Sequence, residues 1–234
     1  MNARTFLVLP LGLILSGCVI ETRTGVARHD NVSVERDASE FLSVNLNMGA
    51  GNLNVSGGAG KFLDGTFVYN IDSWKPVVRY SSSAGHGVLT VAQPGSHHAN
   101  FGAPRYEWNL RLADDIPIDL NVRFGAGEAT LRLGGLFLRS VGVEMGVGQL
   151  DLDLRGAPRR DYDVRIRGGV GEARIRLPRD VGVCAEARGG IGSVRTEGLR
   201  REGAHWVNAA YDRAKTTIHL DVKAGIGAIN LISD

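Results

Sequence analysis

A motif of two glycines around one small or apolar residue recurs six times and constrains the fold of this chain more than any other feature. Glycine is used where the backbone needs a positive φ or is approached closely, so regular glycine pairs indicate regular corners. The first glycines at 125, 146, 169 and 190 are 21, 23 and 21 residues apart, which is typical of one coil of a β-solenoid. The six pairs are Gly49 and Gly51, Gly125 and Gly127, Gly146 and Gly148, Gly169 and Gly171, Gly190 and Gly192, and Gly225 and Gly227.

Apolar and polar residues alternate on both sides of each glycine pair, and this is the period of a β-strand. Val143 and Met145 lead to Val147, whereas the alternation after the pair resumes one position out of phase at Leu150. A straight strand with such a slip would turn its later side chains to the other face, so the chain must bend at the glycines. The sequence therefore predicts an all-β, single-domain, solenoid-like coil of strand, G-x-G corner and strand, whose interior includes Val122, Val147, Ile175 and Leu220.

Two longer intervals interrupt the repeat. The interval from Gly190 to Gly225 leaves room for an insertion that spans roughly Glu202 to Lys215. The interval from Gly51 to Gly125 contains residues 62–109, with a looser glycine pair at 85 and 87. We expect irregular loops in that segment, covering part of the coil.

If successive coils align by their glycines, charged side chains on neighbouring strands fall next to one another. Glu144 would lie between Arg123 and Arg167 on one face. Asp151 and Asp153 would lie beside Arg174 and Arg176 on the other. Such cross-strand pairs contribute only about 0.2–1 kcal/mol each, so we expect them to help fix the register rather than hold the fold.

The first 18 residues have the layout of a secretory signal peptide. Arg4 precedes an apolar run from Phe6 to Leu15, which is shorter than the roughly 18–20 residues of a membrane-spanning helix. Leu15-Ser16-Gly17-Cys18 resembles the bacterial lipobox, which implies cleavage before Cys18 and acylation of that cysteine. An ordinary secretory signal with an incidental cysteine is the alternative.

This interpretation divides the chain into a lipoprotein signal peptide (1–17), a lipidated N-terminus and polar tether (18–31) and a β-repeat domain (32–234). We expect a lipid-anchored protein of the cell envelope, attached to the membrane through its N-terminal lipid. Val19 rather than aspartate follows the cysteine. In a Gram-negative cell this implies the outer membrane, facing the periplasm.

Several functional classes receive no support from the sequence. The net charge of +2 argues against a nucleic-acid binder, and no glycine pair continues as a G-x-G-x-x-G nucleotide fingerprint. His97-His98 and Asp114-Asp115 have no partners at metal-ligand or catalytic spacing, and the neighbours of Cys184 predict a buried, inert thiol. We therefore expect no catalytic residues, metal or cofactor, and we expect the protein not to be an enzyme.

A local excess of arginine between 155 and 179 is the strongest candidate for a binding surface. Within it, Arg165, Arg167, Arg174 and Arg176 could form a face for an anionic ligand. A solvated, partly ion-paired strand face is the alternative interpretation. The aromatic residues Trp74, Tyr106 and Trp108 could add to a ligand site.

Several segments together resemble the toastrack domain of LiaF-type cell-envelope stress proteins. They are residues 45–51, 74–76, 119–127 and 168–178, and the resemblance covers nearly all of 32–233. It implies a coiled β-fold, an envelope location and a role in sensing or modulating envelope stress through contacts with another envelope protein. The alternative function is a binding module for a polyanionic lipid, a glycan or a wall polymer, acting through the arginine-rich face.

Overall fold

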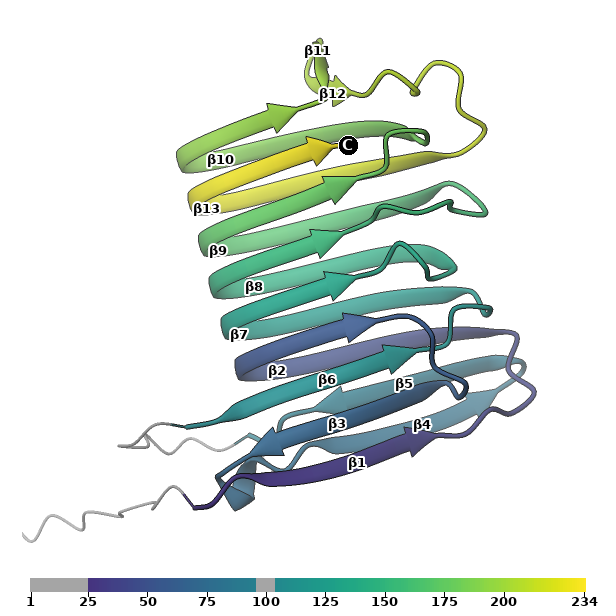
Figure 1. Cartoon of the computed structure of the whole chain (residues 1–234), viewed down its shortest axis with the longest axis vertical. Coiled ribbons are helices and arrows are strands. Elements are labelled where there is room, and N and C mark those ends of the chain that lie inside the picture. Colours follow the sequence, from purple (N-terminus) through teal and green to yellow (C-terminus); the bar gives the residue numbers. More distant parts are fainter. Residues whose placement is uncertain (1–24, 96–103) are drawn as a thin grey trace, which may run out of the picture.

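The computed structural model describes residues 25–95 and 104–234, and strands make up most of this part (Figure 1). Within these residues the strands form one sheet that winds into a coil, with a single 3-10 turn, Asp72–Trp74. Among the residues described, no helix has the length and apolar character needed to cross a membrane. The strands are β1 (Arg28–Val34), β2 (Phe41–Ser56), β3 (Leu63–Tyr69), β4 (Val77–Ser83), β5 (His86–Ala92), β6 (Tyr106–Leu112), β7 (Ile118–Arg132), β8 (Leu138–Asp153), β9 (Tyr162–Leu177), β10 (Gly182–Glu197), β11 (Arg200–Glu202), β12 (His205–Val207) and β13 (Thr217–Ser233).

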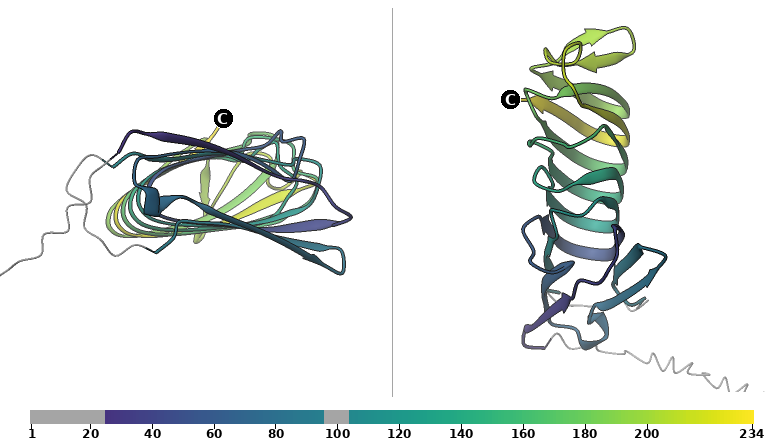
Figure 2. Two further views of the ribbon diagram at one scale, coloured as in Figure 1. Left: turned by 90° about the horizontal axis from the view of Figure 1, so that it is seen from below. Right: turned by 90° about the vertical axis from the view of Figure 1, so that its right-hand side faces the viewer.

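Six long strands, β2, β7, β8, β9, β13 and β10, each fold back at a G-x-G corner (Figures 1 and 2). Each therefore has two arms, one before and one after the corner, that lie on opposite sides of a shared interior. Neighbouring coils are parallel and in register through both arms, so that Val122 pairs with Val143 and Leu131 with Leu152. The predicted solenoid-like architecture is confirmed.

The core consists of the alternating apolar residues of both arms. Val122, Ile175 and Leu220 are all buried, as the alternation predicts. Val147 is not, because 54% of its surface is exposed, and the prediction that the central residue of each corner lines the interior is wrong. The chain reverses at this corner, so its central side chain is exposed and does not continue the alternation of the arm before it.

The second glycine of each corner has a backbone conformation that other residues rarely adopt. At Gly148, φ is +141°, and the carbonyl oxygen of Gly127 in the preceding coil lies where a Cβ would have to be. A side chain there would meet both a backbone penalty and a collision with the neighbouring coil. The repeat therefore needs glycine for two physical reasons at once.

The last coil in the sequence is not the last coil in space. Strand β13 lies between β9 and β10, so that Val222 pairs with Ile166 on one side and with Ala187 on the other. The insertion predicted at about 202–215 contains part of the β11–β12 hairpin and the turns that lead back to β13. Asn208 anchors this connection: its buried amide donates to the carbonyl of Val181 at 2.7 Å and accepts from the Val183 amide at 3.1 Å.

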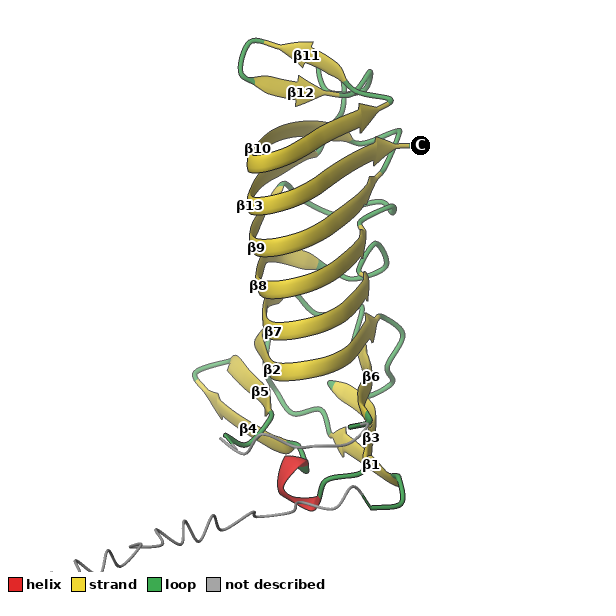
Figure 3. Ribbon diagram, turned by 90° about the vertical axis from the view of Figure 1, so that its left-hand side faces the viewer, coloured by secondary structure: helices red, strands yellow, loops and turns green. Residues whose placement is uncertain are grey.

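The other end of the solenoid is built from short strands rather than from the irregular loops expected at 62–109. Strands β5 and β6 pair in parallel with the two arms of β2, so together they form a coil whose corner is replaced by a longer connection. Strands β4 and β3 pair antiparallel with β5 and β6, and β1 completes the edge (Figure 3). The looser glycine pair does not form a corner. Gly85 lies with Ala84 in the turn of the β4–β5 hairpin, where both have positive φ, and Gly87 belongs to β5.

The predicted signal peptide, Cys18 and the His97-His98 pair lie outside the described residues. The described chain begins beside β1, where the Gly25 amide donates to the carbonyl of Asn70 at 2.9 Å. It therefore enters the domain at the end of the solenoid that is farthest from β10, β11 and β12 (Figure 1).

Candidate functional surfaces

The four arginines predicted to form an anionic-ligand face are divided between two faces of the solenoid. Arg165 and Arg167 project from the first arm of β9, where they alternate with buried Val164 and Ile166. Arg174 and Arg176 project from the second arm, beyond the corner. Because the two arms lie on opposite sides of the core, each pair is on its own face.

Each of these arginines has an acidic partner. Arg167 contacts Asp221 at 2.6 Å and Arg176 contacts Asp151 at 2.9 Å. The other two contact carboxylates of their own strand, Arg165 with Asp163 at 3.2 Å and Arg174 with Glu172 at 3.6 Å. Much of the positive charge at these positions is therefore compensated, and their role in binding an anion stays a prediction.

The predicted alignment of charges across coils is confirmed where successive strands are neighbours. Arg123 donates to Glu144 at 2.9 Å, and Glu144 is in register with Arg167. The position of β13 changes the continuation of this column, because Lys223 lies between Arg167 and Arg188. Three cationic side chains therefore follow one another at the β10 end of this face.

Two other sequence expectations are corrected by the structure. Tyr106 and Trp108 are 4% and 0% exposed and stack edge-to-face in the core, so they do not line a ligand surface. Cys184 is only partly buried, because it lies on the outer face of β10 between inward-facing Val183 and Ala185. The large apolar surfaces of the Tyr106 and Trp108 rings favour their burial in the core.

The central residues of the corners form a continuous apolar ridge along one edge of the solenoid. Neighbouring coils bring them into register one strand apart, at about 4.8 Å. The ridge begins with two alanines and becomes larger toward β10, where Ile191 is 72% exposed. It consists of Ala50, Ala126, Val147, Val170, Ile226 and Ile191, in spatial order.

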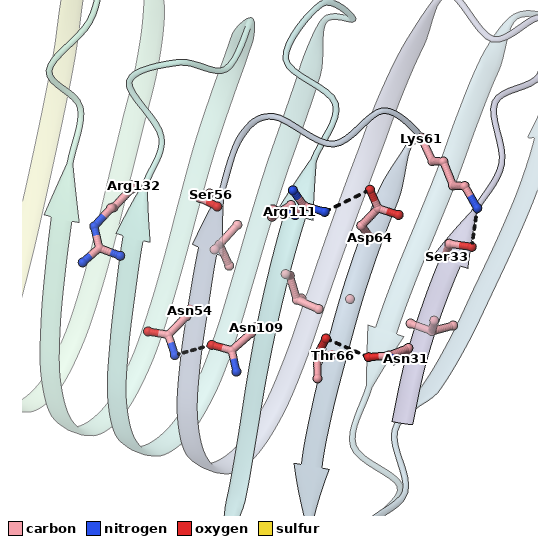
Figure 4. Close-up of a pocket in the computed structure, with 14 residues that line it drawn as sticks. Asn31, Ser33, Asn54, Ser56, Lys61, Asp64, Thr66, Asn109, Arg111 and Arg132 are labelled. Carbon is pink, nitrogen blue, oxygen red and sulfur yellow. Dashed lines mark hydrogen bonds and ion pairs between the residues drawn. The ribbon is translucent and has the colours of Figure 1, made fainter. Parts of the chain in front are cut away.

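A polar groove of about 620 Å³ lies on the outer face of β1, β3, β6, β2 and β7 (Figure 4). One row of side chains across these strands is formed by amides and hydroxyls. Thr66 donates to Asn31 at 2.9 Å, and Asn54 donates to Asn109 at the same distance. A second row contains Ser33, Asp64, Arg111, Ser56 and Arg132.

Positive charge predominates in the groove. Lys61 contacts Glu35 at 2.6 Å, and this hydrogen bond raises the pKa of the lysine. Arg111 contacts Asp64 at 3.5 Å. The side chain of Arg132 has no hydrogen bond or ion pair within the part of the chain that the structure describes. It is therefore the cation of the groove with the most capacity to bind a ligand.

Neither the ridge nor the groove was predicted from the sequence. The ridge could not be recognised because, in the sequence, its residues continue the alternation of apolar residues that are buried in the arm before each corner. The groove combines residues from 31 to 132 that come from five strands, and the pairing of β1, β3 and β6 is not encoded by the glycine repeat. A usable signal was the alternation of asparagine and other polar residues with apolar residues in 45–54 and 107–111.

Two family models match the chain. The model of the N-terminal domain of toast_rack matches residues 23–176, which is more than half of the 234 residues. The model described as cell wall-active antibiotics response LiaF, C-terminal, matches residues 137–231. No curated protein matches the chain.

The chain is similar to proteins of solved structure, and one of them has the same fold. A candidate cell adhesion protein from Clostridium sporogenes is 36% identical, with a TM-score of 0.86, over 89% of this chain and 100% of that chain. A candidate adhesin from Bacteroides fragilis is 13% identical, with a TM-score of 0.34, over 91% of this chain and 99% of that chain. The first likeness extends to sequence and coil arrangement, whereas the second is too distant to support an argument.

Proposed function

Because this chain belongs to the toast_rack family and has a LiaF-like C-terminal region, we propose that it is a non-enzymatic scaffold or sensor of cell-envelope stress that acts through protein contacts. In this proposal Cys18 is acylated and attaches the protein to the envelope membrane. In a Gram-negative cell the protein would lie on the outer membrane and face the periplasm.

The observation that carries the proposal is the apolar ridge. Val147, Val170, Ile226 and Ile191 are 54, 44, 49 and 72% exposed and lie on four adjacent coils. Single exposed apolar residues are common on soluble proteins, but a contiguous row is typical of an interaction surface. The stacked coils hold the row rigid, so a partner would dock without the cost of ordering it.

We propose that the partner that binds this ridge is another envelope protein. Arg167, Lys223 and Arg188 run beside its most exposed end, and each has an acidic partner in its own or a neighbouring strand. The partner should therefore be recognised mainly through apolar side chains that pack on the ridge. The similar protein from Clostridium sporogenes is described as a candidate cell adhesion protein.

The alternative function, binding of a polyanion by the four arginines of β9, has weaker support. Their division between two faces and their acidic partners leave no concentrated positive surface on that strand. A single unpaired arginine in the polar groove offers a different position for an anion.

Site-specific photocrosslinking in intact cells tests the proposal. A photoreactive residue at Val170 or Ile226 should capture the same envelope protein, identified by mass spectrometry. A probe at Gly135, in the loop between β7 and β8, should not capture it, because that loop lies at the edge opposite the corners. Capture of lipid alone, or equal capture from all three positions, would contradict the proposal.

A further inference from the structure

We propose that the polar groove beside β1 binds an acidic saccharide, meaning a sugar chain that carries carboxylate or phosphate groups. The groove lies on the second-arm face at the N-terminal end of the solenoid, away from the ridge at the corners (Figure 4). The inference therefore does not rest on the protein contacts proposed above. The volume of the groove, about 620 Å³, falls within the range of small-ligand sites.

The amide row provides hydrogen bonds of the kind that sugar hydroxyls need. Asn31 uses its side-chain oxygen to accept from Thr66, which leaves its NH₂ group without a partner among the described residues. Asn54 uses an N–H to reach Asn109, which leaves its amide oxygen free in the same sense. Asn31 and Asn54 lie at the two ends of this row, three strand spacings or roughly 14 Å apart. Two different hydroxyls of one sugar chain can therefore use them, one accepting from Asn31 and another donating to Asn54. These unused donors and acceptors are held in a fixed row by the strands.

The charged row adds an anion position. Arg132 is in register with Ser56, and Ser56 with Arg111, so the two arginines are two strand spacings, or roughly 10 Å, apart. Arg111 is partly compensated by Asp64 at 3.5 Å, whereas Arg132 is not paired. Guanidinium groups bind carboxylate and phosphate with strong, charge-assisted hydrogen bonds. An acidic group next to a hydroxyl-bearing unit would therefore fit both rows at once.

The lining also argues against other classes of ligand. It contains no aromatic side chain, so neither a nucleobase nor an aromatic peptide side chain would find a stacking surface. The apolar residues of the lining, Val32, Val55 and Leu110, belong to the alternation that faces the core, and polar atoms predominate at the surface. An anion with many hydroxyl groups is the class of ligand that can use both the amide row and the arginines of the groove.

Calorimetric titration of the full-length lipidated protein in detergent micelles tests this proposal. The probes are trigalacturonate, a glycerol-phosphate oligomer, the neutral trisaccharide maltotriose and inorganic phosphate. We expect at least one acidic oligomer to bind more tightly than both maltotriose and inorganic phosphate. A preference for trigalacturonate would identify carboxylate as the anion, and a preference for the other oligomer would identify phosphate.

Three variants separate specific binding from general attraction of charge. Arg132→Gln should weaken binding of the acidic oligomer roughly tenfold or more, because a charge-assisted hydrogen bond is lost. Arg195→Gln, which removes an equally unpaired arginine from the same face four strands away, should leave it unchanged. Asn31→Ala should weaken the oligomer severalfold. Thermal unfolding of each variant checks that it is folded.

Four outcomes would overturn the proposal. They are the absence of binding by either acidic oligomer, equal binding of maltotriose, equal losses in Arg132→Gln and Arg195→Gln, and binding of inorganic phosphate as tight as that of the oligomers. The photocrosslinking at the ridge is independent of all four, so each proposal can fail without the other.

Discussion

The Cα of Gly148 faces the carbonyl oxygen of Gly127 in the preceding coil, and a Cβ on Gly148 would lie closer to that oxygen than real Cβ atoms approach other atoms. The same relationship recurs from coil to coil along the edge of the solenoid. Close stacking of bare backbone at the corners is therefore the condition for continuous parallel pairing of both arms.

Replacing Gly148 with alanine should destabilise the domain. Its φ of +141° alone implies a cost of about 1–3 kcal/mol, and the collision with Gly127 adds to it. Gly189→Ala is the matched control, because a Cβ there meets nothing within 4 Å and φ is ordinary. Thermal unfolding of both variants checks the prediction, and equal stability of the two would contradict the corner geometry.

Asn208→Ala should destabilise the connection that carries the chain back to β13. The substitution leaves the Val181 carbonyl and the Val183 amide without their side-chain partner in a buried place, at a cost of about 1–3 kcal/mol. Asn52→Ala, at an exposed position of β2, should change stability by less than about 0.5 kcal/mol. The free energy of unfolding in urea distinguishes the two, and a cost no larger at 208 than at 52 would refute the anchoring role.

The ion pair between Arg36 and Asp115 predicts that the stability of the domain depends on pH in the acidic range. Arg36 donates to the Asp115 carboxylate at 2.6 and 2.8 Å, and these hydrogen bonds hold the pKa of Asp115 below its ordinary value of 3.8. The unfolded chain then binds a proton more readily, so the stabilisation is complete above pH 3.8 and is lost as the pH falls below it. Asp115→Asn should have a shallower decline of melting temperature in this range. An identical decline in both proteins would show that the pair makes no contribution.

Cys18→Ser should abolish lipid attachment. Cells fed an alkyne-bearing fatty acid should label the wild-type protein, and the variant should be unlabelled and released from the membrane fraction. Cys184→Ser is the control, because that cysteine belongs to β10 and is not part of the lipobox. Labelling that persists without Cys18 would contradict the proposed anchor.

Much of the coil could be predicted because the glycines fix both the corners and the register. The pairing of Arg123 with Glu144 follows from that register alone. The exposure of Val147 could not be read from periodicity, because the alternation of a strand does not continue through a reversal of the chain. Likewise, the glycine pairs are alike in every coil, so nothing in them specifies that Ile226 stacks between Val170 and Ile191.

The candidate surfaces were harder to predict than the fold. The arginines of β9 stand out in the sequence, yet the corner places Arg167 and Arg174 on opposite faces. The groove depends on antiparallel strands that carry no repeat, such as the pairing of Thr66 with Asn31. Its residues become a group only once the whole sheet is assembled.

The response to a cell wall-active antibiotic tests the central claim, that the exposed ridge carries the function in envelope stress, most directly. We would measure growth under the antibiotic in cells that make the wild-type protein or the triple variant Val170→Gln, Ile226→Gln and Ile191→Gln. These positions are 44–72% exposed, so the variant should fold and accumulate normally. The account predicts that it behaves like a deletion of the protein, whereas Arg195→Gln behaves like wild type. A normal response from the triple variant would contradict the account.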